Sequence, residues 1–270
     1  MRRRGGWLQR GAAVCVALAF TVPVALGVAG TLLQGSGLWR PFATADAASI
    51  HPLRAVLGDP RFLPALSLTL FSGLLATALV ALCSVIVLVS SHGTRVWNGA
   101  LSSLAPLLAV PHAALAVGLL FLLAPSGWLA RLVSPGISGW ERPPSGWTVP
   151  DADAWTLVVG LLVKEMPFLL LAAAAQLPSL DVDQALRIGR TLGYAPARCW
   201  SRLILPRLWP RLRLTFLIIL AFNLSVVDMA ILLGPGHPPT LAVLLLQFLA
   251  DPATRAAASA GALLLTAVVA

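Results

Sequence analysis

Long apolar stretches without charge restrict the fold of this sequence more than any other feature. Gly11–Leu33, Phe62–Ser90 and Gly99–Ala124 contain no Asp, Glu, Lys or Arg. Each is longer than the roughly 20 residues that an α-helix needs to cross the hydrocarbon core of a bilayer. We therefore expect three transmembrane helices here.

Three further apolar stretches carry few charges. Trp155–Leu177 holds Lys164 and Glu165, and Leu214–Leu233 holds Asp228. The last stretch has 15 residues between Arg255 and the end of the sequence at Ala270, or about 23 Å of helix against a core of about 30 Å. The sequence thus predicts an all-α polytopic membrane protein with about six transmembrane helices. We expect this last helix to be truncated, because the sequence would then be a fragment or the first module of a longer protein.

The composition excludes several other classes of protein. With 58% hydrophobic and 11% charged residues, the chain is too apolar for a soluble domain and too rich in large side chains for disorder. All of its 19 basic residues except Lys164 are arginines. They lie between apolar stretches, as the loop charges of membrane proteins do, so we expect no nucleic-acid partner.

The same arginines predict the orientation in the membrane. With the N-terminus inside, the inner segments hold twelve arginines and the outer segments six, as the positive-inside rule requires. We expect a bacterial inner-membrane protein with a cytoplasmic N-terminus. The first apolar stretch exceeds the usual length of a signal-peptide core, which favours an uncleaved anchor over a signal peptide.

The loop between the fourth and fifth predicted spans, residues 178–213, is long enough for two short helices. Ser179 is a candidate N-cap for the first, with Asp181 and Asp183 in its first turn, where the helix dipole favours negative charge. We expect Gly193 to break this helix and Pro196 to lie in the first turn of the second.

The second helix of the loop is predicted to be basic and amphipathic. Trp200, Leu203 and Ile204 would form its apolar face, with Arg198 and Arg202 on another. We expect prolines 206 and 210 to end it. Composition alone fits an interfacial helix bound to anionic lipid, and this interpretation remains open.

The order of residues in this loop resembles the EAA loop of binding-protein-dependent ABC importer permeases, whose consensus ends in a glycine and, after a fixed gap, Leu-Pro. Gly193 matches the glycine, and Leu203, Leu205 and Pro206 match the end of the motif. The family's Glu-Ala-Ala positions fall on 187–189, so its glutamate is replaced by Arg187. Asp183 and Gln184 lie one turn earlier, where they can supply the polar contacts.

The resemblance extends to the rest of the chain from Phe62 onward, and is closest to permeases of thiamine and ferric-iron importers. It rests on the Leu-rich segment 66–70, Val110-Pro111-His112, Pro167 and the segment 239–243. We accordingly divide the chain into residues 1–61, with the first transmembrane helix and an outer loop, and 62–270, a permease core with five further segments.

Membership of this family would imply a transport subunit without catalysis of its own. The sequence has no G-x-x-x-x-G-K-[ST] motif, so ATP would be bound by separate ABC ATPase subunits, and we expect no cofactor or metal. In the family the loop docks on the ATPase as a coupling helix. The loop residues that we expect to contribute are Asp183, Arg187, Arg190, Thr191, Leu192, Gly193, Tyr194, Pro196, Leu203, Leu205 and Pro206.

The other partners implied by the resemblance are a second permease module, either another copy or a fused half, and an extracytoplasmic solute-binding protein. Two rival interpretations have less support from the residues. One is a membrane scaffold or channel whose basic loop binds lipid. The other is a membrane-embedded enzyme using His112 or Lys164, although no motif surrounds either residue.

Polar residues at membrane depth are candidates for the translocation path, because exposure of a charge to lipid is costly. They are His112, Lys164, Glu165, Asn223 and Asp228. We predict an interhelical Lys164–Asp228 pair. The alternative for the charged residues is that their contacts only fix helix packing. For His112 it is a packed neutral ring. Asn223 and Ser225 would instead form interhelical hydrogen bonds.

Overall fold

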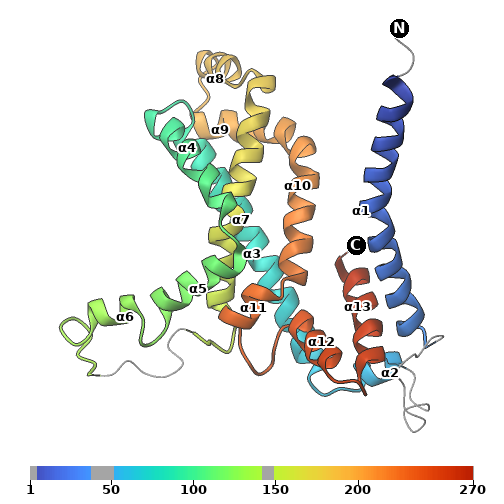
Figure 1. Ribbon diagram of the computed structural model, residues 1–270. Coiled ribbons are helices and arrows are strands. Elements are labelled where there is room, and N and C mark those ends of the chain that lie inside the picture. The colour runs from blue at the N-terminus through green and yellow to red at the C-terminus, as the bar shows by residue number, and fades with distance from the viewer. Residues whose placement is uncertain (1–4, 38–51, 142–148, 270) are drawn as a thin grey trace. The chain divides into compact units, whose positions relative to one another are not determined.

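The computed structural model describes residues 5–37, 52–141 and 149–269, and every regular element within these ranges is helical (Figure 1). Arg40 and Arg142, like the arginines at positions 2–4 used to predict the orientation, lie outside the described residues. The chain divides into two compact units. One consists of the N-terminal part to Phe62 together with Leu244–Val268, and the other is Leu63–Val243.

Four helical segments of the described part are long and apolar enough to cross a membrane: Arg10–Gly35, Phe62–Ser91, His112–Val133 and Trp155–Leu180. Three coincide with predicted spans. The third differs, because the predicted span Gly99–Ala124 is interrupted between α4 (Arg95–Ala109) and α5 (His112–Leu123). The total of six transmembrane helices and the truncation of the last one stay predictions.

Helix α7 (Trp155–Gln176) lies at the centre of the unit formed by residues 63–243 and contacts α4, α5, α10 (Leu205–Ser225) and α11 (Asp228–Leu233). Its Leu157 and Leu161 are fully buried and belong to one core cluster with Met229 and Leu233 of α11. Helix α6 (Trp128–Val133) follows α5. Glycine allows α7 and α11 to pack closely, since a Cβ at Gly160 would lie 2.6 Å from the Leu233 side chain.

Proline explains the interruption between α4 and α5. Val110 has an extended backbone with ψ 123°, and Pro111 follows it. A residue before proline is disfavoured in the helical region, because the proline ring clashes with its backbone. A second interruption falls inside the predicted span Leu214–Leu233, where Val226 is extended at ψ 135° between α10 and α11.

Polar contacts fix α3 (Phe62–Ser91) against α10 and the start of α12 (Leu241–Ala250). The Asn223 side-chain amide donates to the Thr77 hydroxyl at 2.9 Å. The Leu241 backbone N–H donates to Thr69 Oγ1 at 2.7 Å. These buried contacts agree with the expected interhelical role of Asn223. Ser225 instead donates to the Ala221 carbonyl of its own helix at 2.7 Å.

The other unit brings the end of α1 (Gly5–Gly35) against α13 (Arg255–Val269). Ser259 Oγ donates to Gln34 Oε1 at 3.2 Å, and a Cβ at Gly35 would lie 3.0 Å from the Ala260 backbone nitrogen. Helix α2 (Pro52–Leu57) belongs to the same unit.

An ion pair follows α2. Arg61 donates to both carboxylate oxygens of Asp59, at 3.0 and 2.9 Å. These hydrogen bonds hold the pKa of Asp59 below its ordinary value.

Candidate functional site

A helical hairpin occupies the region predicted to couple to an ATPase. Helix α8 (Val182–Thr191) is followed by Leu192 and then by Gly193, whose φ of +81° is a left-handed conformation that favours glycine. The Tyr194 N–H donates to the Gly189 carbonyl and the Gly193 N–H to the Arg190 carbonyl, both at 3.0 Å. This pair of bonds is a Schellman motif, which satisfies the last carbonyls of a helix. The predicted break at Gly193 thus has a defined geometry.

The start of α8 differs from the sequence prediction. Asp181, with φ +47°, precedes the helix, and a short 3₁₀ helix (Leu177–Leu180) comes before it. Ser179 donates to the Gln176 carbonyl at 2.7 Å and also accepts from Arg211. The prediction of Ser179 as N-cap is therefore wrong, because its hydroxyl serves the end of α7 and the arginine of α10.

The second arm of the hairpin begins with Pro196 in the first turn of α9 (Pro196–Cys199), as predicted. A wider π-type turn over Trp200–Ile204 follows, in which the Leu205 N–H reaches back to the Trp200 carbonyl. The prediction that prolines 206 and 210 end the helix is wrong. Pro206 lies in the first turn of α10, where an N–H has no intrahelical partner, and Pro210 lies inside α10.

One side of the hairpin is buried against the ends of α3, α4 and α7. Leu186, Trp200 and Ile204 form a core cluster with Trp97 and Leu170. The two arms touch where a Cβ at Gly189 would lie only 2.4 Å from the Cys199 sulfur. Cys199 is 1% exposed. The sequence offered no signal for this contact beyond a glycine near the end of a helix.

His92, which the sequence analysis did not select, joins the hairpin to the end of α3. Its Nε2 lies 3.4 Å from a carboxylate oxygen of Asp183, in the first turn of α8. Its ring packs edge-on against both Trp97 and Trp200, with centroids 6.1 and 5.4 Å away. Asp183, a predicted coupling residue, therefore makes a contact within its own unit, residues 63–243.

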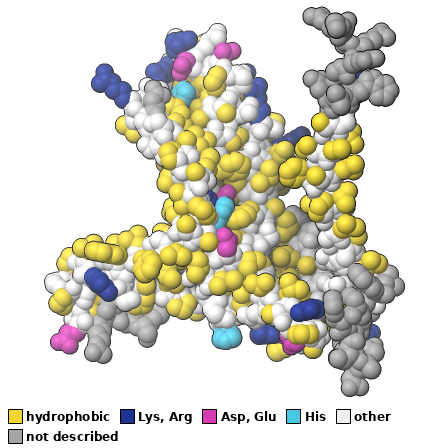
Figure 2. Space-filling view, viewed as in Figure 1, with side chains coloured by type: hydrophobic (Ala, Val, Ile, Leu, Met, Phe, Trp, Pro, Cys, Tyr) yellow, Lys and Arg dark blue, Asp and Glu magenta, His cyan; other side chains and the backbone are white. Residues whose placement is uncertain are grey.

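The opposite side of the hairpin is exposed and mixes apolar and basic side chains. Ile188, Leu192 and Tyr194 are 52%, 68% and 39% exposed. Lys and Arg side chains gather at the end of the unit near α8 (Figure 2). Of the predicted coupling residues, these are the exposed ones: Asp183, Arg187, Arg190, Thr191, Leu192, Gly193, Tyr194, Pro196, Leu203 and Pro206. Leu205 is half-buried.

Lys164 of α7 binds the backbone at the interruption between α4 and α5. It is 6% exposed, and its Nζ donates to the carbonyls of Leu107, Leu108 and Val110 at 3.3, 3.4 and 2.5 Å. The last carbonyls of a helix lack some of their intrahelical donors, and a helix C-terminus attracts a cation. The Leu107 carbonyl also accepts from the Val110 N–H at 3.3 Å. The predicted Lys164–Asp228 pair is wrong because these carbonyls take the ammonium group.

Glu165 belongs to the same interruption. His112, the first residue of α5, places Nε2 3.3 Å from Glu165 Oε1. His112 also stacks on Phe222 of α10 at a centroid distance of 4.5 Å. The helix interruption therefore brings together His112, Lys164 and Glu165 from the predicted set. It leaves out Asn223, which bonds Thr77, and the exposed Asp228, whose carboxylate accepts from the Met229 N–H at 2.9 Å.

The chain is similar in sequence to a known membrane transport protein. Over 205 residues the chain is 36% identical to the inner membrane ABC transporter permease protein YnjC of Escherichia coli (strain K12). The chain resembles an ABC transporter permease. The aligned region is 75% of the chain and 38% of the relative, so the chain spans well under half of that permease's length. No protein-family model matches the chain.

Proposed function

We propose that this chain is a permease subunit of an ABC importer in a bacterial inner membrane, with its N-terminus in the cytoplasm. The hairpin of α8 and α9 carries the proposal. One of its sides is packed into the core of the unit formed by residues 63–243, and the other presents apolar and basic side chains to a partner. Such a surface fits a separate ATPase, because exposed apolar groups ringed by polar ones are typical of protein contacts.

The interruption between α4 and α5 supports a second part of the proposal. Irregular backbone at membrane depth is tolerated where it is buried in protein or lines an aqueous path. The Lys164, Glu165 and His112 groups give this region polar chemistry next to non-helical backbone. We place the solute path along it, with a second permease module forming the other wall and an external solute-binding protein delivering the solute.

In this mechanism the ATPase subunits close on ATP and push on the hairpin. The Schellman turn and the buried core cluster transmit the movement to α3, α7 and α10, which then expose the path to one side of the membrane or the other. The chain itself makes and breaks no covalent bond.

One exposed residue tests the docking claim. Leu192→Asp places a charge on the exposed side of the hairpin without touching the core, and Val96→Asp, at a residue that is 71% exposed on α4, is the matched control. Each tagged variant is purified from native membranes, and the nucleotide-binding subunits that accompany it are quantified by mass spectrometry. Leu192→Asp should lower their yield by more than about tenfold, as loss of an interface anchor does.

The control should retain the wild-type amount of ATPase. Wild-type recovery of ATPase with Leu192→Asp would contradict docking at the hairpin. A lone, stable protein in every preparation would instead favour the scaffold with a lipid-binding loop.

A further inference from the structure

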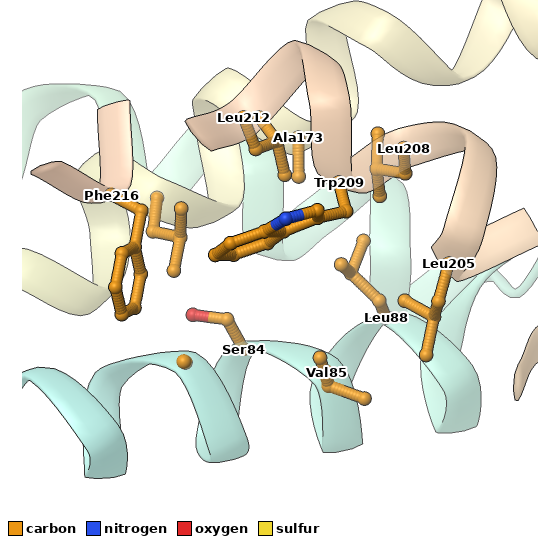
Figure 3. Close-up of a pocket in the computed structure, with 11 residues that line it drawn as sticks. Ser84, Val85, Leu88, Ala173, Leu205, Leu208, Trp209, Leu212 and Phe216 are labelled. Carbon is orange, nitrogen blue, oxygen red and sulfur yellow. The ribbon is translucent and has the colours of Figure 1, made fainter. Parts of the chain in front are cut away.

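An apolar cavity of about 290 Å³ lies between α3, α7 and α10. Its lining includes Leu88 and Ala81 of α3, Ala173 of α7, and Trp209 and Phe216 of α10 (Figure 3). A polypeptide helix, at about 10 Å across, is too wide for such a space. A hydrocarbon chain, one carbon wide and flexible, suits it.

One polar group faces this cavity. Ser84 is 2% exposed, and its hydroxyl has no hydrogen-bond partner among the residues that the structure describes. Figure 3 shows the Ser84 side chain directed from α3 into the space bordered by Trp209 and Phe216. A serine in an apolar wall can donate to one acceptor of a bound molecule. An ester carbonyl at the head of an acyl chain is such an acceptor.

A basic residue of α10, Arg213, lies beside the cavity. Arg213 lies one turn after Trp209 and three residues before Phe216, at the edge of the helix face that lines the cavity. Helix α10 contains no Asp or Glu. The ion pairs within the described residues are Arg61–Asp59, His92–Asp183 and His112–Glu165, so Arg213 has no carboxylate partner there. Its counter-charge must come from solution or from another molecule.

The aromatic residues beside the cavity are of the kind found at the surface of the hydrocarbon core. Trp209 is 54% exposed and packs edge-on against Phe216 at a centroid distance of 5.3 Å. Exposed tryptophans of membrane proteins concentrate at the headgroup level. At that depth an acyl chain can enter the cavity while its phosphate reaches an arginine on the same helix.

We propose that this cavity is a binding site for one anionic glycerophospholipid. An acyl chain fills the space between α3, α7 and α10, the Ser84 hydroxyl donates to an ester carbonyl, and Arg213 pairs with the phosphate and headgroup. Helix α10 begins directly after the hairpin. The lipid would link this end of α10 to α3 and α7. The proposal does not depend on the transport function.

Lipid retention by the purified full-length protein tests the site. Native mass spectrometry follows the titration of the detergent-solubilised protein with phosphatidylglycerol or phosphatidylcholine of identical acyl chains. We expect one phosphatidylglycerol to be retained in preference to phosphatidylcholine. Arg213→Gln should reduce that preference by about fivefold, the effect of one basic residue near an anionic lipid, and leave phosphatidylcholine binding unchanged. Arg207→Gln, on another face of α10, should behave as the wild type.

A second pair of variants tests the cavity itself. Ala81→Leu fills it and should abolish retention of both lipids, whereas Ala78→Leu, at an exposed position of α3, should not. Unchanged retention in Ala81→Leu, or unchanged preference in the folded Arg213→Gln protein, would overturn the proposal. So would disulfide-linked dimers of Trp209→Cys in membranes, since the cavity would then face a second copy of the chain.

Discussion

Lys164 shows what one residue contributes to a membrane protein. Its ammonium group is nearly fully buried, yet it has three carbonyl acceptors at the end of α4. The charge therefore stabilises an interrupted helix that would otherwise leave backbone acceptors unpaired at membrane depth. The sequence indicates an important charge at this position, but not that its partners are backbone atoms about 55 residues earlier in the chain.

Replacing this ammonium should therefore destabilise the protein. Lys164→Met keeps the side-chain length and removes the ammonium donor, so the carbonyls of Leu108 and Val110 lose their contact with it, and Leu107 keeps only the Val110 N–H. We expect the free energy of unfolding to fall by about 2–4 kcal/mol, measured as a lower midpoint of thermal unfolding in detergent. Arg190→Met, at an exposed position of α8, is the control and should not shift the midpoint. Equal midpoints for both variants would show that Lys164 does not cap α4.

At the scale of the element, the hairpin depends on how closely its two arms approach. Gly189 of α8 lies against Cys199 of α9, with no room for a Cβ beside the sulfur. Positive φ at Gly193 turns the chain, and the π-type turn at Trp200–Ile204 then leads into α10. The sequence indicated the turn because glycine and proline mark it. It did not indicate the contact, which depends on how two short helices are oriented in space.

A size exchange across this contact tests its importance. Gly189→Ala should lower stability by about 1–3 kcal/mol, because overpacking forces the arms apart. The double variant Gly189→Ala, Cys199→Ala removes the sulfur that the new methyl group meets, and should recover most of the loss. Thermal unfolding of the single and double variants measures both effects. A double variant no more stable than Gly189→Ala would mean that the arms do not meet in this way.

At the scale of the whole molecule, the proposed function requires one direction across the membrane. The hairpin and α6 lie at opposite ends of the unit formed by residues 63–243 (Figure 1). From the arginine distribution we propose that the hairpin lies in the cytoplasm. A transport subunit driven by an intracellular ATPase requires this orientation.

Cysteine labelling checks the orientation. Cys15, Cys83 and Cys199 are first replaced by alanine, and a cysteine is then placed at Thr191 or at Ile137, which is 82% exposed. A membrane-impermeant maleimide should label Thr191→Cys in inside-out vesicles and Ile137→Cys in intact spheroplasts. Labelling of Thr191→Cys from outside intact spheroplasts would place the hairpin on the wrong side for an ATPase.

The sequence alone predicted the membrane class, three of the four span-length helices and the turn at Gly193. These depend on local properties: the length of apolar stretches, and the backbone preferences of glycine and proline. The tertiary structure decided which charge caps α4, that Asp183 faces His92, and that Pro206 and Pro210 lie within a continuing helix. The physical reason is that these contacts join residues far apart in the chain. Each is selected by the packing of several helices at once, and no local pattern specifies that packing.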